Sequence, residues 1–113
     1  MASEDSAGPS ERDFEAAADR TLRRLEQALS DIGGMEADLE SGILTLEFDD
    51  GDKYVINSHR AARQIWMAAE RNAWHFDLGA GDTWTASKSG EELWGLVERM
   101  VTRKLDHPVA LAR

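Results

Sequence analysis

The chain has 113 residues, a net charge of −9 and no cysteine. This length suits one domain with a single modest core, and the lack of thiols excludes disulfides, thiolate-bound zinc and cysteine nucleophiles. No apolar run approaches the roughly 18 residues of a membrane span, and no basic stretch followed by an apolar one marks an N-terminal signal peptide. We therefore expect a cytoplasmic protein with no membrane partner.

The excess negative charge is concentrated in the first half of the chain. Residues 1–50 hold 14 acidic and four basic residues, a net charge of −10, whereas residues 51–113 have a net charge of +1. A field of this sign repels phosphate backbones, so we expect no nucleic-acid partner. It attracts cations and basic protein surfaces. An acidic surface that serves only solubility is the simpler alternative.

Residues 1–9 are predicted to be a disordered tail, because after the initiator they carry no large apolar side chain to offset the entropy of ordering. Residues 10–113 are predicted to form a single domain. Ser10 is the predicted N-cap of the first helix, followed by acidic residues where the helix dipole favours them. Apolar residues at steps of three and four predict a helix of about five turns that ends at Gly33-Gly34. This stripe contains Phe14, Ala18, Leu22, Leu25, Leu29 and Ile32.

A series of short strands is predicted after the first helix. The expected strands are 35–40, 43–48, 53–57, 64–69, 74–78 and 83–86. Alternating apolar and polar residues provide each strand with one face for the core. Most of the connections are short turns such as Ser41-Gly42 and Asp50-Gly51, which implies an antiparallel sheet.

The second helix is predicted to begin with a capping box, in which Ser89 is the N-cap and Glu92 follows three residues later. Pro108 then ends regular structure. Two amphipathic helices need a surface to bury against, so both are predicted to cover the same face of the sheet, while the other face meets solvent. The predicted fold class is α+β, a two-layer α–β sandwich with the N- and C-terminal helices on one face of a five- to six-stranded antiparallel sheet.

The motifs of common enzyme classes are absent from the sequence. It contains no P-loop, no G-x-G-x-x-G, no G-x-S-x-G and no H-E-x-x-H. The three histidines are scattered, and no serine has an evident base. His75 and Asp77 share a predicted strand face, but two ligands alone make a poor metal site. We therefore expect a protein that is not an enzyme.

Acidic side chains of the first helix and the first strand are predicted to form one ridge of carboxylates. Acids at helical spacing share one edge of the helix, and alternating acids point the same way along the strand. The predicted members are Glu15, Asp19, Glu26, Asp31, Glu36, Asp38 and Glu40. Carboxylate oxygens suit hard cations, so calcium, magnesium, manganese and iron all remain open, and an exposed ridge predicts weak binding. The alternative is a solvated acidic face that Arg20, Arg23 and Arg24 partly neutralise.

The open face of the sheet is a second candidate surface. Asn57, Gln64 and Trp66 are predicted to lie on it. Trp66 alternates with Ile65 and Met67, which indicates that it points away from the core. Tryptophan is enriched at interfaces because it combines apolar area with an N–H donor. The alternative is a tryptophan packed under a loop.

Several short segments between residues 11 and 105 have an order and spacing typical of one protein family. They are Gly42-Ile-Leu-Thr45, Tyr54-Val-Ile-Asn57, Gln64-Ile-Trp-Met67, His75-Phe-Asp-Leu78, and Trp84 followed by Ser89-Gly-Glu-Glu-Leu-Trp94. Together they resemble the bacterial frataxins, the CyaY-type proteins. The resemblance implies an α–β sandwich and a non-catalytic, iron-binding regulator or iron-delivery protein of iron–sulfur cluster assembly.

The resemblance also implies a cargo and partners. It implies ferrous or ferric iron bound weakly, with no organic cofactor. The iron-binding residues that it implies are Glu15, Asp19, Glu26, Asp31, Glu36 and Asp38. The implied partners are a cysteine desulfurase and an iron–sulfur scaffold protein, with Asn57, Gln64 and Trp66 on the contact surface. It further implies a monomer, or oligomers that form with iron. The alternative from another class is an acidic protein-interaction module without a metal role, and ferroxidase-type iron oxidation is a third.

Overall fold

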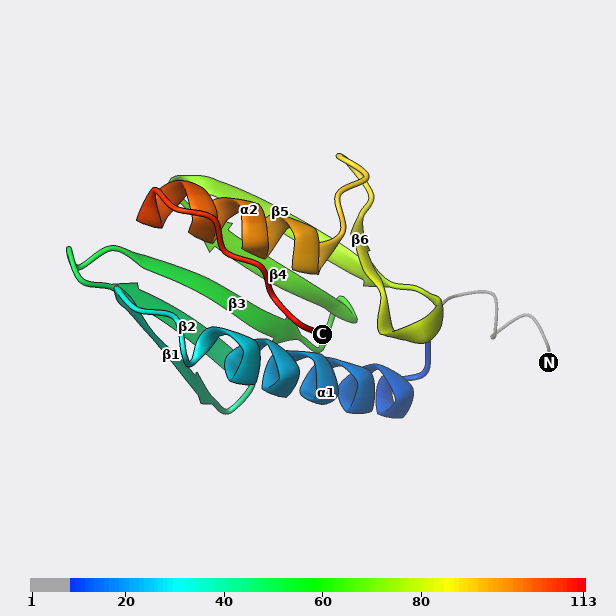
Figure 1. Ribbon diagram of the computed structural model, residues 1–113. Helices are drawn as coiled ribbons and strands as arrows, with labels where there is room; N and C mark the ends of the chain where they lie inside the picture. The colour runs from blue at the N-terminus through cyan, green and yellow to red at the C-terminus, as the bar shows by residue number, and fades with distance from the viewer. Residues whose placement is uncertain (1–8) are drawn as a thin grey trace, which may run out of the picture.

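The computed structural model describes residues 9–113 and begins with the predicted helix (Figure 1). Helix α1 (Glu11–Leu29) follows Ser10, whose Oγ accepts a hydrogen bond from the Asp13 N–H at 3.0 Å. The predicted N-cap is therefore confirmed. The predicted end of the helix is wrong, because α1 stops at Leu29 and Ile32 lies in the following turn. The Ser30 hydroxyl donates to the Gln27 carbonyl at 3.0 Å, a local bond that favours ending the helix here.

Six strands follow in the predicted order. They are β1 (Met35–Glu40), β2 (Ile43–Phe48), β3 (Lys53–His59), β4 (Gln64–Ala69), β5 (Asn72–Leu78) and β6 (Trp84–Ala86). Each strand pairs antiparallel with the next, and the sheet has the order β1-β2-β3-β4-β5-β6. A short 3-10 helix, η2 (Ala80–Asp82), connects the last two strands.

Strand β5 begins two residues earlier than predicted because the β4–β5 turn is tight. Ala69 pairs with Asn72, so Glu70 and Arg71 alone form the turn, with φ of 53° and 70°. Positive φ at both central residues matches the right-handed twist of the flanking strands. This turn sets the register of β4 against β5.

Helix α2 (Leu93–Leu105) begins later than predicted, and the predicted capping box is wrong. Glu92 is the N-cap, and its Oε1 accepts a hydrogen bond from the Trp94 N–H at 3.1 Å. The helix begins later because the segment that precedes it makes other contacts. Thr85 of β6 forms an isolated bridge with Glu92, and the Ala86 N–H donates to the Glu91 carbonyl at 2.8 Å. These contacts hold the residues after Ser89 in a non-helical conformation.

Both helices cover the same face of the sheet, which leaves the other face open (Figure 1). This confirms the predicted α+β sandwich of two helices on one antiparallel sheet. The core lies between the layers and includes the fully buried Trp84, Tyr54, Phe14 and Phe76. Within the described residues, neither helix is long and apolar enough to cross a membrane. Of the predicted tail, residues 1–8 lie outside the described residues, and the Pro9 carbonyl accepts a hydrogen bond from Arg63 Nη1 at 2.9 Å.

Candidate functional site

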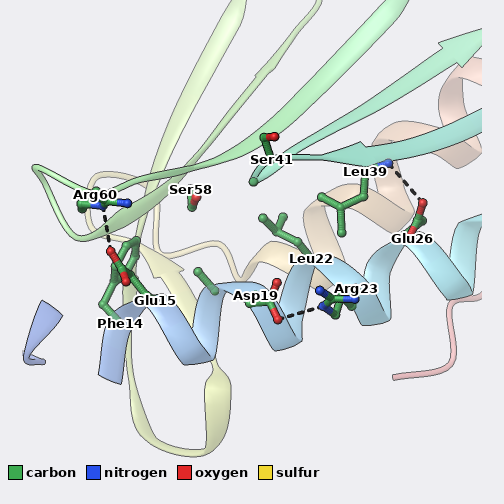
Figure 2. A pocket seen from close by; sticks show the side chains of 12 residues that line it. Phe14, Glu15, Asp19, Leu22, Arg23, Glu26, Leu39, Ser41, Ser58 and Arg60 are labelled. Atoms are coloured by element: carbon green, nitrogen blue, oxygen red, sulfur yellow. Dashed lines mark hydrogen bonds and ion pairs between the residues drawn. The ribbon is translucent and has the colours of Figure 1, made fainter. Parts of the chain in front are cut away.

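Three of the predicted ridge residues lie along one groove beside α1. The groove has a volume of about 430 Å³ and runs between α1, the β1–β2 turn and the end of β3 (Figure 2). Glu15, Asp19 and Glu26 line it. Asp19 follows Glu15 by one turn of the helix, and Glu26 follows Asp19 by two turns, as the predicted spacing requires. The structure therefore brings the helical half of the predicted ridge to one surface.

Each carboxylate in this groove contacts a hydrogen-bond donor of the protein (Figure 2). Glu15 Oε2 lies 2.7 Å from Arg60 Nε, and Asp19 Oδ2 lies 2.8 Å from Arg23 Nε. The hydrogen bond with Asp19 raises the pKa of the Arg23 guanidinium above its ordinary value. Glu26 Oε2 accepts from the Leu39 N–H of the edge strand β1 at 3.1 Å. The negative charge of the groove is thus partly neutralised within the protein.

The ridge residues of β1 lie on the other side of that strand. Met35 and Leu39 of β1 pack with the core, whereas Glu36 and Asp38 are exposed. Successive side chains of a strand point to opposite faces, so Glu36 and Asp38 belong to the open face, away from α1. The prediction of one continuous ridge is therefore wrong. The helix and strand carboxylates form two groups separated by the edge strand.

Asp31 lies in neither group. It follows the end of α1 and lines a different groove with Arg24 and Arg113. Across residues 9–113, no three or more histidine, aspartate or glutamate side chains are placed to hold one metal ion. The carboxylates of this end of the molecule are spread over a surface rather than gathered at a point.

A row of side chains crosses the open face at right angles to the strands. Ile43 of β2 stands opposite Asn57 of β3, Asn57 opposite Trp66 of β4, and Trp66 opposite His75 of β5. Ile43 is 47% exposed, and among the described residues it is the large hydrophobic residue most open to solvent. Asn57 and Trp66 thus share the face on which the sequence predicted them.

Polar contacts and ring stacking hold Trp66 in place. Its Nε1–H donates to Gln64 Oε1 at 2.8 Å, and Gln64 Nε2 donates to Asp77 Oδ1 at 2.9 Å. The His59 ring stacks on one side of the indole at 3.7 Å between centroids, and the His75 ring stacks at 4.2 Å. The interplanar angles are 16° and 15°. The three predicted contact residues therefore lie in one ordered patch.

The two stacked histidines were not predicted as part of this surface. His75 was predicted only to share a strand face with Asp77, and its pairing with Trp66 depends on the register of β4 and β5. The two-residue turn at Glu70-Arg71 sets that register. A hairpin assignment for this turn is the sequence signal that would have placed His75 beside Trp66.

The chain matches the model of the frataxin-like domain over residues 8–107. The chain belongs to the frataxin family. This confirms the resemblance drawn from the sequence motifs. Frataxins as a family are generally non-enzymatic, and membership of the family supports an iron-related role in iron–sulfur cluster assembly.

Solved frataxin structures have the same architecture. The frataxin of Psychromonas ingrahamii is 24% identical, with a TM-score of 0.84, and the match covers 93% of this chain and 100% of that one. Trimeric frataxin from the yeast Saccharomyces cerevisiae, with its full-length N-terminus, is 26% identical, with a TM-score of 0.69 and coverage of 80% and 79%. A trimeric yeast frataxin complexed with ferrous iron is 24% identical, with a TM-score of 0.63 and 88% coverage of each chain.

Proposed function

We propose that this frataxin is an iron-binding regulator or iron-delivery protein that acts on a cysteine desulfurase–scaffold complex. The observation that carries the proposal is the presence of two chemically different exposed surfaces on one small domain. One is the acidic edge, by which we mean the two groups of carboxylates that α1 and β1 carry on either side of the edge strand. The other is the open sheet face around Trp66. A protein that delivers a cation to an assembly needs one surface that holds the cation and another that contacts the assembly.

On the acidic edge, iron binds weakly as cargo. Glu15 and Asp19 are exposed and hold guanidinium groups that an iron ion has to displace. Exposed ion pairs of this kind contribute only about 0–1 kcal/mol, so a divalent or trivalent cation can compete with them. Carboxylate oxygens suit such hard cations. Among solved relatives, a yeast frataxin is complexed with ferrous iron.

The same acidic edge docks against a basic patch of the desulfurase. Glu36 and Asp38 are exposed on β1, and Glu47 stands directly opposite Glu36 on β2. Like charges placed opposite each other on a sheet are unfavourable. A basic partner surface relieves this repulsion and steers the encounter.

The open face docks the scaffold protein through Asn57, Gln64 and Trp66. Trp66 supplies aromatic area, and its orientation is already set by Gln64 and the two histidine rings. A side chain that is ordered before binding loses little conformational entropy when the partner arrives.

A pull-down with the desulfurase tests the acidic edge. Glu36→Lys together with Asp38→Lys is expected to weaken binding by about tenfold or more, because both charges are reversed where the basic patch docks. Asp106→Lys, which reverses an exposed carboxylate just beyond α2, serves as the control and should bind like the wild type. Undiminished binding of the double variant would remove the docking role.

Trp66→Ala tests the open face. It is expected to weaken engagement of the scaffold while thermal unfolding stays close to that of the wild type, because Trp66 is outside the buried core. A large loss of thermal stability would instead show that Trp66 acts in packing.

Metal titration separates this proposal from an acidic interaction module without a metal role. Ferrous and calcium ions are titrated while amide NMR signals are followed. Shifts confined to α1 and β1 are the expected result, and no shift with iron would favour the module. Ferrous oxidation by oxygen above the rate in buffer would point to the ferroxidase alternative.

A further inference from the structure

Both faces of the Trp66 indole are covered by histidine rings. His59 and His75 stack on opposite sides of it, with ring centroids 3.7 Å and 4.2 Å away. A partner on the open face therefore meets the edges of three stacked rings, not a bare aromatic surface. The nitrogen atoms of the imidazoles lie on those edges, so the protonation of the histidines changes what the partner contacts.

The two histidines differ in their hydrogen bonds. His59 Nδ1 accepts a hydrogen bond from the Ala62 N–H at 3.3 Å, and a proton on that nitrogen would break the bond. His75 is exposed, and within residues 9–113 its ring nitrogens have no hydrogen-bond partner. His75 is thus the member of the stack that can become an imidazolium without losing a contact. Stacked on indole, this cation gains a cation–π attraction.

A hollow of about 480 Å³ opens beside His75. Lys88 and the hydroxyl-bearing Ser87 and Ser89 line it together with His75, Trp74 and Gln64. The hydroxyl groups are hydrogen-bond donors, and Lys88 carries a positive charge. Groups of these two kinds bind carboxylates. The hollow lies on the β5–β6 side of the sheet, and the acidic strand β1 forms the opposite edge.

Two charged groups stand near His75: Lys88 lines the same hollow, and Asp77 carries a negative charge two residues along the same face of β5. Asp77 of β5 accepts a hydrogen bond from Gln64. Arg60, beyond β3, pairs with Glu15 and Glu11 of α1, and Arg63 donates to the Pro9 carbonyl. The arginines are therefore engaged toward α1.

We propose that His75 and Lys88 form a proton-dependent binding site, the carboxylate seat, for a carboxylate side chain of the partner protein that docks on the open face. The stacked rings of Trp66 and His59 form one rigid side of this site. This rests on the proposed function, because it specifies how that face recognises its partner. The occupant follows from charge complementarity, since a protonated His75 beside Lys88 places two positive charges at the rim of one hollow. Protonation of His75 then makes the free energy of docking more favourable.

Tryptophan fluorescence of the free protein tests the proton response without any partner. An imidazolium in contact with an indole quenches its emission, so wild-type emission is expected to fall between about pH 8 and pH 5.5. His75→Gln should lose most of this response. His59→Gln and His107→Gln, which leave His75 in place, should keep it. An unchanged response in His75→Gln would overturn the proposal.

Binding to the purified desulfurase–scaffold complex tests the carboxylate seat. Dissociation constants are measured at about pH 6.5 and pH 8 for the wild type and His75→Gln, so that titration of the partner cancels in the comparison. The wild type is expected to gain at least about threefold more affinity at the lower pH than His75→Gln does. Lys88→Ala should weaken binding at both pH values.

The outcomes separate the two proposals. Equal pH dependence in the wild type and His75→Gln overturns the seat while leaving the proposed docking intact. A wild type that does not bind at either pH contradicts the proposed function and the seat with it. In that case the fluorescence measurement still shows whether His75 acts as the proton-responsive member of the stack.

Discussion

Trp84 shows how one buried polar atom joins two layers of this frataxin. Its indole is fully buried, and Nε1–H donates to Oγ1 of the buried Thr21 at 2.9 Å. Phe14 of the same helix meets the indole edge to face, with ring centroids 5.9 Å apart. The hydrogen bond therefore connects β6 to α1 in the core. A buried N–H without a partner is costly.

Thr21→Val is expected to lower the free energy of unfolding by about 1–3 kcal/mol, because it removes the acceptor and leaves the Trp84 N–H buried and unpaired. Urea unfolding at neutral pH measures this. Thr45→Val on the open face is the matched control, and it should change stability by no more than about 0.5 kcal/mol. Equal stability of Thr21→Val and the wild type would show that Thr21 does not serve as the acceptor.

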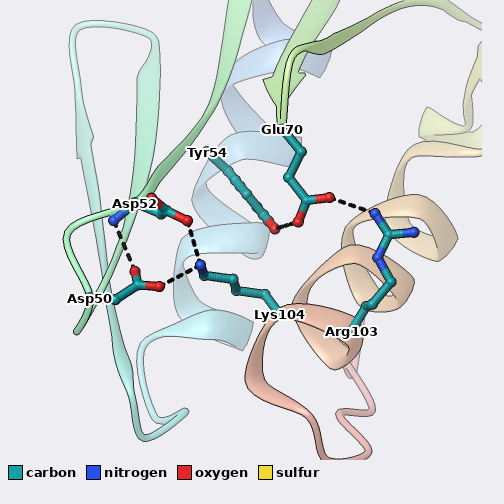
Figure 3. Close-up of polar contacts among 6 residues, drawn as sticks. All are labelled: Asp50, Asp52, Tyr54, Glu70, Arg103 and Lys104. Carbon is teal, nitrogen blue, oxygen red and sulfur yellow. Dashed lines mark hydrogen bonds and ion pairs between the residues drawn. The ribbon is translucent and has the colours of Figure 1, made fainter.

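At the scale of elements, two turns of the sheet are tied to the last turns of α2 (Figure 3). Lys104 Nζ lies 2.6 Å from Asp50 Oδ2 and also contacts Asp52, both in the β2–β3 turn. In the β4–β5 turn, Glu70 accepts a hydrogen bond from the Tyr54 hydroxyl and pairs with Arg103 at 2.5 Å. These contacts connect α2 to the end of the sheet that carries the β2–β3 and β4–β5 turns.

The ionisation of these side chains follows from their contacts. Hydrogen bonds from Tyr54 and Arg103 lower the pKa of Glu70, and the hydrogen bond from Lys104 lowers the pKa of Asp50. Burial, followed by the bond to Glu70, raises the pKa of Tyr54. The native state thus binds protons on these carboxylates less readily than the unfolded chain does, so they stabilise the fold when ionised.

Stability is therefore expected to fall in acid. The contribution of Glu70 is fully present above its ordinary pKa of 4.5 and is lost as the pH falls through the lower native value. Urea unfolding between about pH 6 and pH 3 measures the loss. Glu70→Gln should be less stable at neutral pH by about 1 kcal/mol and should show a smaller loss in acid. A slope identical to that of the wild type would contradict this assignment, and Glu40→Gln at the exposed end of β1 is the control.

At the scale of the whole molecule, the C-terminal segment after α2 closes the helical layer. It runs back between α1 and α2 (Figure 1). Val109 N–H donates to Thr102 Oγ1 at 3.0 Å, and Leu111 N–H donates to Glu98 Oε2 at 2.8 Å. Arg113 pairs with Glu92, the N-cap of α2. The segment thus covers apolar surface that the two helices alone leave exposed.

Deletion of residues 109–113 is expected to destabilise the domain by roughly 2 kcal/mol, because Val109 and Leu111 pack against the core and two backbone hydrogen bonds are lost. This corresponds to a fall in Tm of about 10 °C. Thermal unfolding followed by circular dichroism measures it. Arg113→Ala, which removes an ion pair with Glu92 and a cation–π contact with Trp94, should have a smaller effect. A truncated chain that melts like the wild type would show that the segment contributes nothing to the core.

The sequence by itself determined the two helices, the six strands, their antiparallel order and the face on which Trp66 lies. Each of these depends on a local period or a short turn, such as the alternation of Trp66 with Ile65 and Met67, and local patterns can be read without knowing what packs where. The frataxin motifs could be recognised for the same reason, because they are short segments in a fixed order.

Only the tertiary structure decided which charges and rings meet. Arg60 reaches Glu15 from a distant loop, and the bridge between Thr85 and Glu92 moves the start of α2 past Ser89. His59 and His75 enclose Trp66 because strand register aligns three separate strands. Such contacts join residues that are far apart in the chain. Their geometry follows from packing and strand register, and the local periodicity of a sequence contains no information about either.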